Sequence, residues 1–167
     1  APGCTPCPCA NDDVGGIGGC RNDSGTGSRL IATGAASVAE DTLRFELQGM
    51  PATTSGTLFS GANQLPANAI NPCFAFASGV DNLGDGLRCM GGSALRHGTR
   101  FSDTNGDIGE TNNGWGPPNG PPGGLIAFSG FAAGQTRHFQ VIHRDAASSG
   151  CGSGLNSSQG VTVTFDL

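Results

Sequence analysis

The chain of 167 residues is long enough for one domain with a buried core, and its 30 glycines and 10 prolines disfavour a helical protein. The net charge is −5 and the eight cations are all arginines, scattered along the chain, which argues against nucleic acid as a partner. The absence of lysine excludes Schiff-base catalysis and lysine–asparagine cross-links, and no apolar run reaches the ~20 residues that span a bilayer.

The first segment, residues 1–28, is rich in Cys, Pro and Gly and has no alternating apolar pattern. We therefore predict a disulfide-stapled N-terminal arm, followed by a β domain over residues 29–167. Ala1 would suit the first residue after cleavage of a signal peptide, so we expect a mature, exported protein that is extracellular or attached to the cell surface.

Cysteine chemistry is the main functional question, because three thiols lie in the opening APGCTPCPC. A zinc knuckle would use Cys4 and Cys7, but a second C-x-x-C or a histidine pair at the right spacing is missing, although Cys9 and Cys20 could complete a four-thiolate site. Disulfides fit an exported, glycine-rich chain better. The predicted disulfide residues are Cys4, Cys7, Cys9, Cys20, Cys73, Cys89 and Cys151.

The connectivity of these cysteines is left open by the sequence. Cys73 and Cys89 are close enough for a bridge between neighbouring strands, worth ~3 kcal/mol by loop closure. The four early cysteines pair among themselves, or one of them reaches Cys151. An odd count leaves a thiol that either links two chains or stays free and buried.

Short strands are predicted along the body. Leu43, Phe45 and Leu47 alternate with polar residues, as in a half-buried strand that ends at Gly49–Pro51. Other candidates are 29–33, 56–60, 73–77, 86–91, 94–97 and 124–129.

The last two strands have the clearest alternation. Within QTRHFQVIHRD one face carries Arg137, Phe139, Val141 and His143, and the closing GVTVTFDL alternates Val, Phe and Leu with Thr and Asp over 160–167. Many short strands separated by turns predict an all-β fold, an antiparallel β-sandwich or jelly roll. A terminal strand such as 160–167 can also add to a neighbour's sheet edge.

Four blocks in order, GAASVAEDTLRFELQGMPATTSGTLFSGAN, GDGLRCMGGSALR, AGQTRHFQVIHRD and SQGVTVTFDL, resemble a β-rich domain of secreted multi-cysteine proteins from planctomycete- and myxobacteria-like bacteria. The resemblance covers about residues 21–167. It implies export and a β fold, and it implies no established catalytic activity. The Cys/Pro arm departs from it.

Two motifs are candidate ligand sites. Asp103, Asn105 and Asp107 alternate in SDTNGDIGE with Glu110 beyond, a pattern of oxygens that can wrap calcium, although an EF-hand would need Gly at Ile108; an Asx-rich turn is the alternative. Trp115, the only tryptophan, lies in a Gly/Pro loop, where it either stacks on a sugar or packs against the sandwich.

Catalysis has little support in the sequence. A G-x-S-x-G elbow is absent, and the three histidines, His97, His138 and His143, have no evident nucleophile partner. We therefore expect a non-enzymatic extracellular structural protein, a self-assembling surface or filament subunit that forms homo-oligomers. The alternative is a secreted carbohydrate-binding module with a calcium loop.

Overall fold

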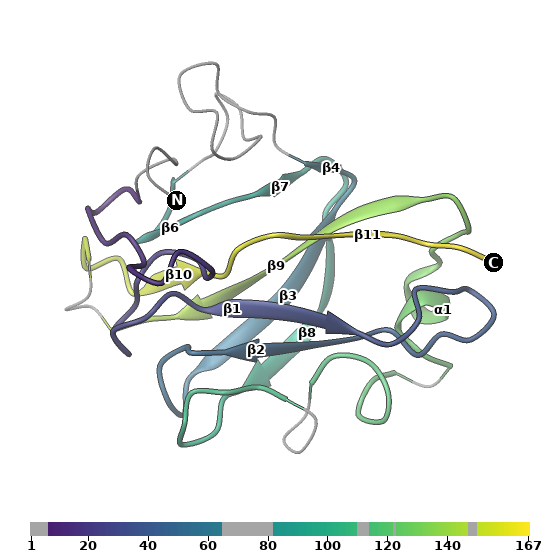
Figure 1. Cartoon of the computed structure of the whole chain (residues 1–167), viewed down its shortest axis with the longest axis horizontal. Helices are drawn as coiled ribbons and strands as arrows, with labels where there is room; N and C mark the ends of the chain where they lie inside the picture. Colours follow the sequence, from purple (N-terminus) through teal and green to yellow (C-terminus); the bar gives the residue numbers. More distant parts are fainter. Residues whose placement is uncertain (1–6, 65–81, 110–113, 122, 147–149) are drawn as a thin grey trace.

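The computed structural model describes residues 7–64, 82–109, 114–121, 123–146 and 150–167. These ranges form strands and one short helix (Figure 1). The elements are β1 (Arg29–Thr33), β2 (Arg44–Gln48), β3 (Ser55–Gly61), β4 (Asn63–Gln64), β5 (Asn82–Leu83), β6 (Gly86–Leu87), β7 (Met90–Gly91), β8 (Leu95–Phe101), α1 (Leu125–Ser129), β9 (Thr136–Arg144), β10 (Leu155–Ser157) and β11 (Val161–Thr164).

An antiparallel five-stranded sheet forms the larger layer. Its order is β10-β9-β3-β8, and β11 also pairs with β9. Strand β9 is long enough to pair with β11 along its first half and with β10 at its end, while β3 occupies its other side. The predicted alternation is confirmed, because Arg137, Phe139, Val141 and His143 are all buried.

The ribbon β1–β2 lies across this sheet (Figure 1). Two further segments extend its β2 edge, since Phe45 bridges to Trp115 and Leu47 bridges to Ile108. The apolar side chains of ribbon and sheet meet, with the rings of Phe45 and Phe139 4.5 Å apart. The buried core comprises Leu30, Leu43, Phe45, Leu47, Met50, Leu58, Ile108, Trp115, Leu125, Ile126, Phe131, Phe139, Val141, Val163 and Phe165.

Polar side chains close the two margins between ribbon and sheet. On one margin the Gln159 amide donates to Leu30 O at 2.7 Å, and its oxygen accepts from Leu30 N at 2.9 Å. On the other, the Trp115 indole N–H donates to Gly98 O on β8 at 2.8 Å. These bonds satisfy backbone groups that strand pairing leaves open.

The all-β class predicted from the sequence is confirmed, whereas the finer assignment to a sandwich or jelly roll stays a prediction. Candidate 73–77 lies outside the described residues. Candidate 86–91 forms two separate short strands, β6 and β7, and β10 was not anticipated. Among the residues described, no helix is both long and apolar enough to cross a membrane.

The strand expected at 124–129 is wrong, because residues 125–129 form the helix α1. The Asp41 carboxylate accepts from Ile126 N at 2.9 Å and from Ala127 N at 2.7 Å, so it satisfies donors at the start of this helix. Gly130 then ends the helix in the left-handed conformation with φ 68°. The capping residue lies far away in sequence, which hides the helix from local pattern analysis.

Candidate functional site: the disulfide-locked arm

The described part of the arm, residues 7–28, forms an irregular layer at the end of the sheet where β6 and β10 lie (Figure 1). None of the core residues comes from this segment. Its buried residues are small or polar apart from one cysteine: Asn11, Cys20, Asn22, Gly27 and Ser28. Apolar burial therefore does not explain how the arm is held.

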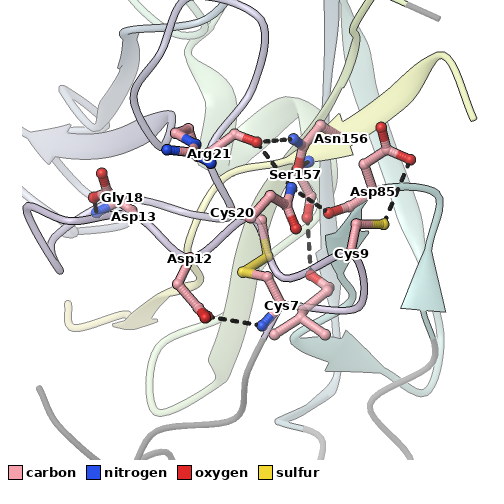
Figure 2. The surroundings of a disulfide bond; sticks show 12 residues. Cys7, Cys9, Asp12, Asp13, Gly18, Cys20, Arg21, Asp85, Asn156 and Ser157 are labelled. Atoms are coloured by element: carbon pink, nitrogen blue, oxygen red, sulfur yellow. Dashed lines mark hydrogen bonds between the residues drawn. A yellow bond between two sulfur atoms is a disulfide. The ribbon is translucent and has the colours of Figure 1, made fainter. Parts of the chain in front are cut away.

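A first disulfide closes the arm on itself. Cys7 bonds to Cys20 with their Cα atoms 5.7 Å apart (Figure 2). The Cys7 N–H donates to the Asp12 carboxylate at 2.9 Å, which fixes the turn between the two cysteines. A loop of this length is worth ~3 kcal/mol in the chain-entropy model.

A second disulfide ties the arm to the body. Cys9 bonds to Cys151 across a sequence separation of 142 residues. The Cys9 sulfur also faces the fully buried Asp85 carboxylate, with Sγ 3.9 Å from Oδ1 (Figure 2). This bond joins the beginning of the described chain to the segment just before β10.

Two buried asparagines replace the missing apolar contacts. The Asn11 amide donates to Arg21 O at 2.8 Å and to Asp85 O at 3.0 Å. The Asn22 amide donates to Ser28 Oγ at 2.9 Å and to Gly49 O at 2.8 Å. Each amide therefore connects one part of the arm both to another part and to the body.

The buried carboxylate of Asp145, on the body, accepts a hydrogen bond from the arm. Its Oδ1 accepts from Asp23 N at 2.9 Å, and its Oδ2 accepts from the Asn156 amide at 3.0 Å. The same Asn156 amide donates to Arg21 O at 3.3 Å. These contacts align the arm along β10.

His143 provides a further tie between arm and body. Its Nδ1 lies 3.0 Å from Arg144 O, so we assign the ring proton there, and Nε2 then accepts from Ser28 Oγ at 2.7 Å. Burial lowers the pKa of His143, with opposing contributions from the Arg144 backbone and Asp145. A neutral ring is the form that this hydrogen bond requires.

Close backbone contact explains two glycines of the arm. A Cβ on Gly19 would lie 2.0 Å from Ser157 O, and one on Gly18 would lie 2.2 Å from Gly27 O. Any side chain at these positions would separate the arm from β10, or would separate Gly18 from the arm segment at Gly27.

The predicted disulfide at Cys89 is wrong, because Cys89 is a free, buried thiol. Its sulfur lies 3.4 Å from the Gln140 amide nitrogen and 3.7 Å from Leu87 O, and the residue is 9% exposed. Burial raises the pKa of this thiol to about 11. Cys4 and Cys73 lie outside the described residues.

The zinc alternative loses its ligands, since Cys7, Cys9 and Cys20 are all bonded to other sulfur atoms. Within the described ranges, one group of potential metal ligands lies close together, formed by Cys9, Asp85 and Cys151 within 4.8 Å of one another. Two of its three members form the disulfide.

The predicted calcium loop forms an Asx-type turn in the part that is described. One carboxylate oxygen of Asp103 accepts from Asn105 N at 2.8 Å and from Asp107 N at 3.0 Å. The Asp107 carboxylate accepts from Gly49 N at 3.1 Å. The hydrogen bonds from the backbone N–H groups of Asp107 and Asn105 lower the pKa of Asp103. Glu110 lies outside the described residues, and calcium binding stays a prediction.

The prediction that Trp115 presents a ring to a ligand is wrong. Trp115 is 1% exposed and belongs to the core. Its indole N–H needs an acceptor when buried, and Gly98 O supplies one. The polar end of the ring thus faces the β8 backbone, and no face of the Trp115 ring is left for a sugar.

The remaining histidines, His97 and His138, each have hydroxyl groups as ring partners. His97 Nε2 lies 2.8 Å from Ser60 Oγ and its Nδ1 lies 3.2 Å from Ser129 Oγ, and burial together with nearby Arg137 lowers its pKa to about 4. His138 Nδ1 lies 2.9 Å from Thr162 Oγ1. Ser60 is fully buried, so the Ser60–His97 pair cannot meet a substrate.

Comparisons with protein families, characterised proteins and solved structures found no match. The resemblance to a bacterial secreted family stays a prediction. The role of the junction between arm and body is therefore inferred from its bonds and contacts alone.

Proposed function

We propose that this protein is a non-enzymatic extracellular structural protein whose arm is locked onto a β body by disulfides, and which assembles as a surface or filament subunit. The observation that carries the proposal is the Cys9–Cys151 bond, which joins residues 142 positions apart. Disulfides of this kind persist in oxidising compartments and are rare where thiols are kept reduced.

The way in which the arm is held supports a structural role for the protein. A segment without core residues contributes little stability through burial, so covalent and hydrogen-bonded ties must hold it. The Cys9–Cys151 bond closes a loop that includes nearly the whole body, and a loop of that length is worth ~5 kcal/mol in the chain-entropy model. A protein exposed to proteases and changing solvent benefits from such a constraint.

The titratable groups favour a structural role over catalysis. The free thiol of Cys89 has a pKa raised to about 11, so it carries almost no nucleophilic thiolate near neutral pH. The pKa of His97 is lowered to about 4 and both of its ring nitrogens have serine partners. Neither group has the properties of an activated nucleophile or a general base poised near neutrality.

The closing strand is already paired along one edge within its own chain, which makes it a poor donor strand for assembly. Strand β11 pairs with β9 of its own chain, and Asp166 bridges to Ser37, so the C-terminal segment is already engaged. Exposed apolar side chains are the better contacts between subunits: Val14 is 92% exposed and Ile17 62% on the arm, and Phe101 is 67% exposed on β8.

Electron microscopy of protein purified from its native source tests assembly directly, and ordered surface layers or filaments are expected. Reducing and non-reducing gels test covalent linkage between subunits. If subunits are covalently linked, the wild-type protein should give a ladder of oligomers on the non-reducing gel. Four cysteines pair within the chain and Cys89 is buried, so this ladder should disappear in the variant Cys4→Ser with Cys73→Ser. Isolated monomers by microscopy, at concentrations where the native source holds the protein, would contradict the proposal.

The carbohydrate alternative has lost its aromatic platform through the burial of Trp115. Its remaining feature is the loop at Asp103 and Asp107. A thermal melt with and without EDTA tests this loop, and an unchanged melting temperature would remove calcium from the account.

A further inference from the structure

The bond that locks the arm has a buried carboxylate beside it. Asp85 Oδ1 lies 3.9 Å from Cys9 Sγ, and the Cys151 sulfur belongs to the same group of atoms, all within 4.8 Å. Asp85 is fully buried and held on several sides: its Oδ1 accepts from Ser153 N at 3.2 Å, and its own N–H donates to Leu155 O at 2.8 Å. The carboxylate therefore has a fixed position relative to the disulfide.

Reduction of a disulfide by a small thiol places negative charge on sulfur. The thiolate attacks one sulfur in line, a new S–S bond forms, and the old bond breaks with its electron pair leaving on the other sulfur. A second thiol of the reductant then releases the remaining cysteine, so the protein gains two thiols and the reductant becomes a disulfide. In the transition state the charge is shared by the attacking and the leaving sulfur.

Both directions of attack bring this charge close to Asp85. Attack on the exposed Cys151 makes Cys9 the leaving thiolate, 3.9 Å from the carboxylate. Attack on the half-buried Cys9 brings the incoming thiolate toward the sulfur that faces Asp85. Like charges at this separation repel strongly where the site is partly shielded from water.

We propose that Asp85 protects the Cys9–Cys151 disulfide against reduction by thiols, most of all by anionic ones. This inference rests on the proposed function, in which that bond is a permanent lock. In this proposal the negative charge of Asp85 repels the thiolate charge that develops on sulfur. A residue that only packed against the disulfide would not do so.

The variant Asp85→Asn tests the charge with almost no change of shape, since its amide oxygen can still accept from Ser153 N. Dithiothreitol reduction, quenched by alkylation and read by mass spectrometry, gives the rate at each disulfide separately. We expect reduction of Cys9–Cys151 about tenfold faster in the variant, with Cys7–Cys20 unchanged. Equal rates in variant and wild type at Cys9–Cys151 would overturn the proposal.

A matched control uses the carboxylate near the other disulfide. Asp12 accepts from Cys7 N at 2.9 Å but is exposed to solvent, which screens its charge. Asp12→Asn should therefore change the rate at Cys7–Cys20 less than about twofold.

Charged reductants separate electrostatic protection from loosening of the fold, and they work on the wild-type protein. A cationic aminothiol should be favoured over an anionic sulfonate thiol more strongly at Cys9–Cys151 than at Cys7–Cys20, and Asp85→Asn should remove the difference. If the variant is reduced faster at both disulfides by both reagents, the fold has loosened, Asp85 has only a packing role and the proposal fails. The reduction rates are read on single chains, so a failure of assembly leaves them interpretable.

Discussion

The arm and the body of this protein are held by different forces. The body buries fifteen clustered core residues between a sheet and a ribbon. The arm over residues 7–28 contributes none of these and relies on two disulfides, the amides of Asn11 and Asn22, and the Asp145 carboxylate. One chain thus combines a region that folds by burial with a region that is fastened by specific bonds, and the two should respond differently to reduction, truncation and acid.

The largest expected effect comes from removing the tie between the two regions. Cys9→Ser with Cys151→Ser should lower the free energy of unfolding by about 5 kcal/mol, because the unfolded chain regains the freedom of a long loop. Denaturant titration gives this value. Hydrogen exchange should show the arm amides, such as those of Gly19 and Arg21, opening locally, so that they become less protected than those of β3 and β9, whose protection falls only with the global free energy of unfolding.

Two outcomes would break the comparison. If the arm amides of the variant stay as well protected as those of β3 and β9 in native buffer, the two regions open as one cooperative unit. If the arm keeps its protection without the disulfide, its hydrogen bonds alone are enough.

Removal of a core side chain from the body should also lower the free energy of unfolding, here through lost packing. Phe139 is fully buried and its ring lies 4.5 Å from that of Phe45, so Phe139→Ala should cost about 4 kcal/mol through the cavity it leaves. Phe128→Ala is the matched control, because Phe128 is 68% exposed and should change stability by less than about 0.5 kcal/mol. Equal losses in the two variants, measured by urea denaturation, would contradict the assigned core.

The same division explains what could be predicted from the sequence. Strands β2, β9 and β11 were predicted because one face of each is buried. A strand that is buried on one face has apolar and polar residues in alternation, and this alternation is visible in the sequence. The prediction of a separate arm over residues 1–28 rested on the absence of that pattern and on the cysteines.

Features fixed by distant partners were missed. The helix α1 depends on Asp41, and the burial of Trp115 depends on an acceptor at Gly98. Nor did the spacing reveal which cysteines pair, since the partner of Cys9 is brought near only by the fold. The one available signal for the helix end was Gly130, which suits a left-handed C-terminal cap.

Acid should weaken the body through His97. Its pKa in the folded protein is lowered from 6.5 to about 4, so the unfolded chain takes up the proton first. Stability is therefore complete well above pH 6.5 and falls by about 3 kcal/mol as the pH drops to 4. His97→Gln should flatten this part of a stability-against-pH curve, measured by urea titration at each pH. A wild-type curve that is already flat between these values would contradict the burial of a neutral ring.

The smallest predicted effect tests whether a polar contact can replace apolar burial in the arm. Asn22 is 4% exposed, and its amide donates to Ser28 Oγ and Gly49 O. Asn22→Ala should cost about 1 kcal/mol or slightly more, because Gly49 O loses a donor in a partly buried place. Asn22→Asp is the matched variant: it keeps the shape and the oxygen that accepts from Ser24 N, but it loses both donated bonds. We expect Asn22→Asp to be at least as destabilising as Asn22→Ala, measured by denaturant titration of the oxidised protein, since its carboxylate would face the Gly49 carbonyl. If Asn22→Asp is instead neutral, the contacts of the acceptor oxygen are enough and the disulfides carry this part of the arm.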